Sequence, residues 1–385
     1  MKKIIVLMSC LLWSATAFAA DITIDTTMTD QEIITAIESA QAGNTVLIQP
    51  GTYQVRLYIQ NHGTAQNPIT IKGVDPNNRP VFDYTGKDVE LWPGTVKPEE
   101  PEEWLSWYAI VNQGNYVVMQ DLVVKGARRS GAAASAGIYN GPKGTVREPA
   151  DDGTQPLNFI LRNVEITDCD DGFNSTGLNT LVENCYLHGN GYPDQITGRH
   201  NAYIHGGSIT FRDTVFENAL SGQHITNRAQ LMTIDNCTFG EMGSFPFLML
   251  TPKADMTDGV EFEQRMIIRN SQISGIRHNG LGLSKMIEVI NVNKYVGLKQ
   301  YLRLYNNTFV GAPGSKGVIV ALIREAGTAA MGLTSIGNSY ENYGDFLRLS
   351  PGENINDSFY KINVRDVAGF ENNYPIGAIE LLLLE

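Results

Sequence analysis

The sequence predicts an all-β, single-domain protein whose chain winds into a parallel β-helix, a solenoid of short strands. Three observations indicate this fold: a recurring unit of apolar residues around an Asn or Asp, unequal spacing between these units, and a helix signal near the N-terminus. With 42% hydrophobic and 18% charged residues, the chain is neither disordered, collagenous nor a multi-span membrane protein. Its 385 residues would allow two or three domains, so the repeats decide the architecture.

Each repeat places alternating apolar residues on both sides of an Asn or Asp corner. The corners are Asp121, Asn163, Asn184, Asp213, Asn236, Asn270 and Asn306. Steps between the last six are 21, 29, 23, 34 and 36 residues, which argues against a propeller or leucine-rich repeat of fixed length. A β-sandwich is the alternative, but it gives no reason for an Asn or Asp at one fixed place. We expect the corner side chains to stack on the coils above and below, along the inside of the solenoid.

The N-terminal part supports a capped solenoid. Residues 21–24 predict a strand, and Thr29 and Glu32 predict a capping box that opens an amphipathic helix through Ala40. We expect residues 20–53 to form an N-terminal cap and residues 365–385, which end in an apolar run, to form a C-terminal cap. Long loops are expected at 86–108, 141–156 and 251–264. Such loops can build the walls of a substrate groove or be ordinary solvent loops.

The first residues predict export. Residues 1–19 contain Lys2 and Lys3, an apolar run and then Ala17-Phe18-Ala19, the pattern of a secretory signal peptide. The domain proper would therefore span residues 20–385, in the periplasm or secreted. No later apolar stretch reaches the length of a membrane span, so no membrane insertion is expected.

Charge restricts the partners. The formal net charge is −12, so nucleic-acid binding is not expected, and an acidic-polysaccharide site would need a local basic cluster. Three of the six histidines, His200, His205 and His224, lie close to Arg199 and Arg228. We expect a monomer, because a capped solenoid needs no partner to complete its core.

Counting back from the corners aligns three strands. Asn174, Tyr203 and Thr226 fall in one column, and the period of two turns Phe173, Ala202, Ile204 and Ile225 inward. The same parity predicts one exposed face, made by Asn201, Tyr203, His205, His224 and Arg228.

Two short segments resemble known proteins. Ala42-Gly43-Asn44-Thr45 and Pro50-Gly51-Thr52-Tyr53 resemble the openings of the pectate-lyase-like right-handed parallel β-helix superfamily. The segment from Arg199 to Gly206 resembles the His-Asn-x-Tyr-x-Gly segment of exported bacterial β-helix repeat proteins, and Gly222 to Ala229 their next coil. The resemblance implies a right-handed coil and a polysaccharide-lyase-like activity. Thr226 and Asn227 stand where that group has Lys-Ser, so the base would be a His or Tyr instead.

The predicted reaction is β-elimination from a uronate polymer, which needs a group to neutralise the carboxylate, a base and an acid. Arg228 and Asn201 could neutralise the carboxylate, His224 or His205 could act as base, and Tyr203 as acid. The candidate catalytic residues are His224, Tyr203, Arg228, His205, Asn201 and His200. The candidate substrate-binding residues are Asn174, Arg199, Lys125, Arg128 and Arg129.

Other readings remain open. Asp168, Asp170 and Asp171 could bind a calcium ion (Ca²⁺), although no cofactor is required for the predicted reaction. Asp170-Asp171 is also similar to the paired carboxylates of β-helix glycoside hydrolases. A hydrolase, an epimerase and a noncatalytic carbohydrate-binding surface protein are therefore the alternatives to a lyase.

The cysteines are predicted to be free thiols in the core. Cys185 and Cys237 share an inward column but lie two coils apart, nearly 10 Å at about 4.8 Å per coil, beyond disulfide reach. The pattern leaves the state of Cys169 open.

Overall fold

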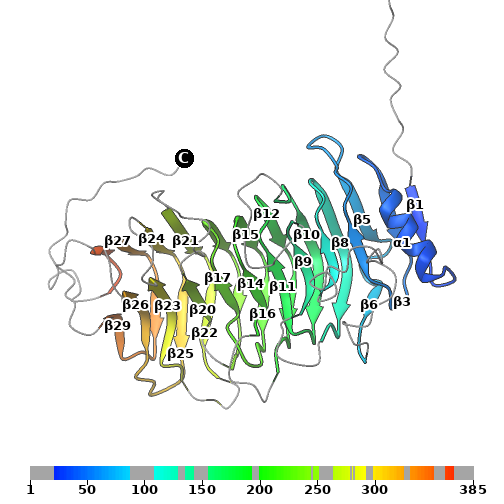
Figure 1. Ribbon diagram of the computed structural model, residues 1–385. Helices are drawn as coiled ribbons and strands as arrows, with labels where there is room; N and C mark the ends of the chain where they lie inside the picture. The colour runs from blue at the N-terminus through cyan, green and yellow to red at the C-terminus, as the bar shows by residue number, and fades with distance from the viewer. Residues whose placement is uncertain are drawn as a thin grey trace, which may run out of the picture.

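The computed structural model shows a right-handed parallel β-helix (Figure 1). It describes residues 21–86, 108–128, 135–142, 155–192, 199–243, 246–250, 263–277, 280, 282–291, 298–324, 330–350 and 360–367. The expected signal peptide lies outside these ranges, as do most of the three expected loops and residues 368–385 of the expected C-terminal cap. Within the described ranges, no helix has the length and hydropathy that crossing a membrane requires.

Two parallel sheets form the walls of the solenoid. The 10-stranded sheet contains β4 (Leu57–Ile59), β7 (Tyr108–Asn112), β9 (Ala136–Asn140), β11 (Asp171–Ser175), β14 (Ala202–Ile204), β17 (Ile225–Asn227), β20 (Phe247–Leu250), β23 (Lys285–Asn291), β26 (Val318–Arg324) and β29 (Asp345–Leu349). Neighbouring strands of this sheet belong to successive coils, and Figure 1 shows β9, β11, β14 and β17 following one another along the solenoid. This sheet carries the candidate site.

The 20-stranded sheet bends around the Asn/Asp corners, because most coils supply one strand before the corner and one after it. Its strands are β1 (Asp21–Ile24), β2 (Thr45–Ile48), β3 (Thr52–Tyr53), β5 (Ile69–Gly73), β6 (Val81–Asp83), β8 (Val117–Lys125), β10 (Ile160–Thr167), β12 (Thr180–Glu183), β13 (Tyr186–His188), β15 (Ser208–Arg212), β16 (Val215–Glu217), β18 (Leu231–Asp235), β19 (Thr238–Phe239), β21 (Glu263–Arg269), β22 (Gln272–Gly275), β24 (Lys299–Tyr305), β25 (Thr308–Gly311), β27 (Ala330–Ile336), β28 (Ser339–Glu341) and β30 (Tyr360–Val364).

The corner residues explain the repeat. All seven corners have left-handed backbone conformations, with φ between 50° at Asn163 and 58° at Asp121. Asn and Asp adopt this conformation more readily than other non-glycine residues. The repeated Asn or Asp therefore reflects the left-handed backbone that each corner requires. Side chains of successive corners also pair, as Asn163 Nδ2 donates to Asp121 Oδ1 at 2.7 Å. The expectation that they line the inside is wrong, because Asn184, Asn236 and Asn270 are exposed.

One continuous apolar core fills the solenoid. The predicted register is confirmed, since Phe173 pairs with Ala202, and Ala202 with Ile225, all fully buried. At the N-terminal end, α1 (Asp30–Ser39) begins at the predicted capping box, and its Ile33, Ile34 and Ile37 join this core. Figure 1 places α1 beside β1 at the end of the solenoid.

The thiol prediction is also confirmed. Cys185 and Cys237 are free and buried, and so is Cys169, whose state the sequence left open.

Candidate functional site

The outer face of the 10-stranded sheet gathers polar and aromatic side chains from three adjacent strands. Asn174 on β11, Tyr203 on β14 and Thr226 on β17 are register partners, as predicted. Because their strand neighbours Phe173, Ala202 and Ile225 face the core, these three side chains lie on the opposite, outer side. We call the group formed by Asp171, Asn174, His200, Tyr203, His205, Thr226 and Arg228 the outer-face site.

Tyr203 is the centre of the outer-face site. Arg228 Nε donates a hydrogen bond to Tyr203 Oη over 3.0 Å. The ring of His205 stacks on Tyr203 with centroids 4.0 Å apart, and the ring of His200 meets it edge-on at 5.3 Å. Tyr203 and Arg228 are half-buried, whereas both histidines are buried. A phenol in contact with a guanidinium is therefore the part of the site that solvent reaches.

His200 is held as a neutral imidazole. Its Nδ1 accepts the backbone N–H of Gln223 at 3.1 Å, and Thr226 Oγ1 lies 3.3 Å from the same nitrogen. Burial, together with the positive charge of Arg199, lowers the pKa of His200 to about 3. With Nδ1 accepting, the ring proton is on Nε2 at neutral pH.

Asp171 forms the buried floor of the outer-face site. Its Oδ1 accepts the backbone N–H of His200 at 2.7 Å, and its Oδ2 accepts from Asn174 Nδ2 at 3.3 Å. Burial raises the pKa of Asp171 to about 7, against the opposing effects of the His200 N–H and the nearby Arg199. The carboxyl group can therefore hold or release a proton near neutral pH.

Two predicted site residues lie elsewhere. Asn201 and His224 are fully buried, so the prediction that they share the exposed face is wrong. His205 was predicted on the same exposed face, but it stacks on Tyr203 and is only 6% exposed. Asn201 precedes β14 and His224 precedes β17, at a corner where the alternation of the strand no longer applies. There Asn190 Nδ2 donates to Asn201 Oδ1 at 2.9 Å, and Asn201 Nδ2 donates to His224 Nδ1 at 3.0 Å. His224 Nε2 lies 3.2 Å from the Gly240 carbonyl oxygen. This ladder is internal and does not reach a substrate.

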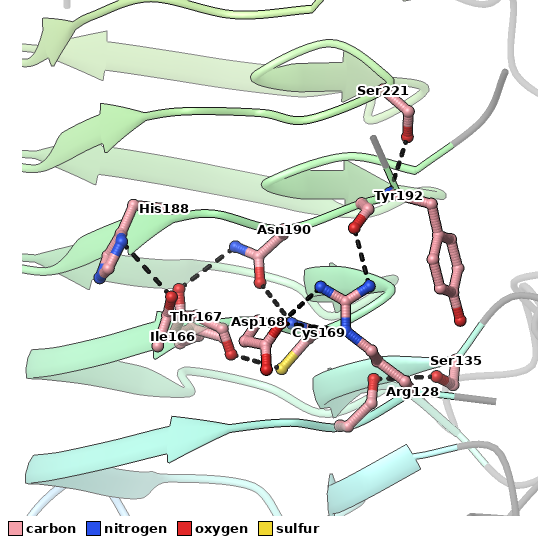
Figure 2. Close-up of polar contacts among 12 residues, drawn as sticks. Arg128, Ser135, Ile166, Thr167, Asp168, Cys169, His188, Asn190, Tyr192 and Ser221 are labelled. Atoms are coloured by element: carbon pink, nitrogen blue, oxygen red, sulfur yellow. Dashed lines mark hydrogen bonds and ion pairs between the residues drawn. The ribbon is translucent and has the colours of Figure 1, made fainter. Parts of the chain in front are cut away.

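Two of the predicted basic extensions, Arg128 and Lys125, are engaged in ion pairs. Figure 2 shows the Arg128 guanidinium between Asp168 and Tyr192, with Nε 3.0 Å from Asp168 Oδ1. Arg128 also donates to the Gly191 carbonyl at 2.8 Å and lies 4.8 Å from the Tyr192 ring centroid. Arg128 therefore stabilises the corner between two coils, and its donors are not directed at a substrate.

The other basic residues have separate positions. Lys125, at the end of β8 in the larger sheet, pairs with Asp83 at 3.0 Å. Arg199 is buried close to Asp171, where its charge acts on that carboxylate. Arg129 lies outside the described residues. Among the substrate-binding candidates that the structure describes, Arg199 is thus the one basic residue beside the outer-face site.

The three candidate calcium ligands do not converge. Asp168 is paired with Arg128, while Asp170 Oδ2 accepts the hydroxyl of Ser135 at 2.7 Å. Asp171 belongs to the outer-face site instead. Across the part of the chain that the structure describes, no group of three or more His, Cys, Asp or Glu could hold a metal ion. The described residues therefore do not fit the predicted calcium site.

The structure adds residues that the sequence did not single out. Tyr139 on β9 is the register partner of Asn174, and it stacks on Tyr108 with centroids 4.6 Å apart. Its coil could not be aligned by counting from a corner, although Gly137-Ile138-Tyr139-Asn140 does alternate. Thr226 and Gln223, which hold His200, were in the aligned segment but had no assigned role. The backbone contact that gives Gln223 its role leaves no sequence signal.

No family model matches the chain. No curated protein matches it either. Solved structures do resemble it, among them an alginate lyase from Paenibacillus sp. strain FPU-7, at 15% identity and a TM-score of 0.57. That match covers 86% of this chain and 99% of the lyase.

Two weaker likenesses are to other carbohydrate-related proteins. The rice weevil pectin methyl esterase is 14% identical with a TM-score of 0.44, covering 73% of this chain and 86% of the esterase. The pectate lyase Pel9A is 14% identical with a TM-score of 0.42, covering 80% of this chain and 70% of that protein. At 15% identity the likeness to the alginate lyase shows the fold alone, that of a parallel β-helix.

Proposed function

We propose that this parallel β-helix is a polysaccharide lyase that cleaves an acidic, uronate-containing polysaccharide by β-elimination at the outer-face site. The observation that carries the proposal is the hydrogen bond from Arg228 Nε to Tyr203 Oη, which joins the residue after β17 to the neighbouring strand β14. It places a group that transfers protons beside a group that binds a carboxylate. The likeness in fold to an alginate lyase supports the same kind of reaction.

Arg228 is the proposed neutralising group. A guanidinium binds a carboxylate through two parallel hydrogen bonds, and its charge stabilises the negative charge that develops when the C5 proton leaves. Arg228 is half-buried, and the hydrogen bond from its Nε to Tyr203 Oη holds the guanidinium beside the phenol. Asn201, the second neutraliser predicted from sequence, is excluded because its amide is bonded to Asn190, Glu217 and His224 inside the corner.

His205 and Tyr203 are the proposed base and acid. His205 accepts the C5 proton, the electron pair forms the C4–C5 double bond, and the bond from C4 to the glycosidic oxygen breaks. Tyr203 donates its proton to that oxygen, which leaves as a hydroxyl group. Because Tyr203 Oη accepts from Arg228, its own O–H points elsewhere, as an acid that protonates a leaving group requires. His200 borders Tyr203 as a neutral ring and fixes its orientation.

The proposal includes the remaining expectations from the sequence. The partner is an acidic polysaccharide and not a nucleic acid, in keeping with the net charge of −12. The protein acts after export, in the periplasm or outside the cell, as a monomer, and the reaction requires no cofactor. These parts follow from the sequence patterns and from the residues assigned above.

Ultraviolet absorbance of the unsaturated uronate product tests the proposal. Alginate, pectate, glycosaminoglycans and bacterial exopolysaccharides are each incubated with the protein, with calcium and with chelator. We expect one polymer class to give product, and Tyr203→Phe and Arg228→Gln each to lower kcat by about 100-fold or more. Gln272→Leu, on the exposed outer side of β22 in the other sheet, is the control and should retain full activity.

A glycoside hydrolase is the second candidate, because Asp171 has a pKa raised to about 7 and could act as a general acid. Hydrolysis would produce new reducing ends without unsaturated product. Formation of reducing ends alone, lost in Asp171→Asn and retained in Tyr203→Phe, would replace the lyase proposal with this one.

A further inference from the structure

Asn174 has a buried amide oxygen that the fold leaves without a hydrogen bond. The side chain is 2% exposed, and its Oδ1 has no partner. Such atoms are uncommon because a buried acceptor without a donor loses the hydration it had in the unfolded chain. Its position, between Tyr139 and Tyr203 in the register, connects this oxygen to the outer-face site.

The hydrogen bond to Asp171 determines how the Asn174 amide is oriented, with its nitrogen toward Asp171 and its oxygen away from it. Nδ2 of Asn174 donates to Asp171 Oδ2 at 3.3 Å, three residues back along β11. The amide is planar and trigonal, so Oδ1 points away from Nδ2 and therefore away from Asp171. Asp171 is itself held, because its Oδ1 accepts the backbone N–H of His200 at 2.7 Å. The two hydrogen bonds of Asp171, to Asn174 and to the His200 backbone, therefore fix the orientation of the Asn174 amide.

We propose that Asn174 is a specificity-determining residue whose Oδ1 accepts a hydrogen bond from a sugar hydroxyl adjacent to the uronate held at Tyr203, with Asp171 as the positioning residue for the amide. The inference rests on the proposed function, since it names what the same site selects. A hydrogen bond from the hydroxyl would satisfy the acceptor that the fold leaves unpaired, so it stabilises the bound sugar. A sugar without a donor at that position would leave the oxygen unpaired and bind less well.

A double-mutant cycle tests the pair. Asn174→Leu removes the acceptor at similar volume, and Asp171→Asn permits the Asn174 amide to turn, because an asparagine at 171 offers either a donor or an acceptor. Asp171→Asn still provides an Oδ1 acceptor for the His200 N–H. Gln272→Leu, an amide lost from the far sheet, is the matched control. Thermal unfolding of every variant verifies that it is folded.

The polymer that wild type cleaves is the probe, with initial rates at several concentrations. We expect each single variant to raise KM about tenfold with kcat nearly unchanged, and the double variant to equal either single variant. Wild-type KM in folded Asn174→Leu, or additive effects in the double variant, would overturn the proposal. If Asn174→Leu does not fold, a wild-type KM in Asp171→Asn overturns it instead.

Retention in gels that contain each polymer separates this inference from the proposed function. If wild type forms no product with any polymer, the lyase proposal fails. The inference then rests on retention: loss in Asn174→Leu and Asp171→Asn but not in Gln272→Leu supports it, and equal retention of all four proteins contradicts it.

Discussion

Burial at the outer-face site acts on an acid and a base in opposite directions. The pKa of Asp171 is raised from 3.8 to about 7, and that of His200 is lowered from 6.5 to about 3, in both cases mainly by desolvation. Both groups are therefore neutral in the folded protein over a range where they would be charged in the unfolded chain. The site tolerates two buried ionisable groups because neither has to carry charge.

Asp171→Asn should change how stability depends on pH. Between about pH 4 and 7, folded Asp171 keeps a proton that the unfolded chain releases, so the free energy of unfolding falls as pH rises. Above pH 7, this raised pKa lowers the free energy of unfolding by on the order of 4 kcal/mol. His200 has the opposite effect below pH 6.5, where only the unfolded chain is protonated.

We therefore expect Asp171→Asn to raise Tm above that of wild type at about pH 8 and to show a steeper loss of Tm on acidification. Differential scanning calorimetry across the pH range measures this. Parallel Tm curves for the two proteins would show that Asp171 is ionised in the folded state.

His224→Ala should damage the fold and leave the chemistry intact. Its ring packs against both Phe216 and Phe239 and closes the internal ladder from Asn190 and Asn201, so we expect a loss of about 3 kcal/mol in stability. Activity per folded molecule should stay near that of wild type. His205→Ala is the comparison and should lose activity with a smaller change in Tm. A large loss of kcat in a fully folded His224→Ala protein would instead show that His224 takes part in catalysis.

At the scale of elements, the contact between β11 and β14 holds the site together. The backbone N–H of Gly172 donates to the His200 carbonyl at 2.9 Å, next to Asp171. A Cβ on Gly172 would lie 2.5 Å from the Asn201 carbonyl oxygen and 2.8 Å from Asn190 Nδ2. Only glycine allows the two strands to approach this closely.

Gly172→Ala should therefore separate β11 from β14 and shift Asn174 relative to Tyr203. We expect a loss of about 2 kcal/mol in stability together with a lower kcat/KM. Gly240→Ala is the control, because its new Cβ meets only the flexible Glu217 side chain at 3.0 Å. Thermal unfolding and steady-state kinetics compare the two, and equal behaviour would mean that the strand contact does not position the site.

Strand register could be predicted from sequence, whereas the direction of individual side chains at strand ends could not. Tyr203 and Thr226 were aligned correctly because each strand lies at a constant distance from its Asn or Asp corner. Asn201 and His224 precede their strands, where backbone torsions break the period of two. Arg128 was assigned to substrate because its partner Asp168 lies 40 residues later in the sequence. Such ion pairs between coils depend on the lengths of the intervening loops, which the repeat pattern does not predict.

The cysteines that the structure describes lie in the core of the solenoid and form no disulfide bonds. Cys169, Cys185 and Cys237 are buried in it as free thiols, and burial raises the pKa of each to about 12. These thiols should not react with a disulfide reagent in the native protein and should all react after denaturation. Mass spectrometry of labelled peptides measures both states. A disulfide-linked peptide, or a fall in Tm with dithiothreitol, would contradict this account.

The proposed β-elimination depends on proton transfer at Tyr203. The most direct measurement is the ultraviolet product assay with wild type and Tyr203→Phe on the same panel of acidic polysaccharides. We expect unsaturated product from one polymer class with wild type, and a rate at least about 100-fold lower with a Tyr203→Phe protein of unchanged Tm. Product formation at the wild-type rate by Tyr203→Phe, or no unsaturated product from any polymer, would contradict it.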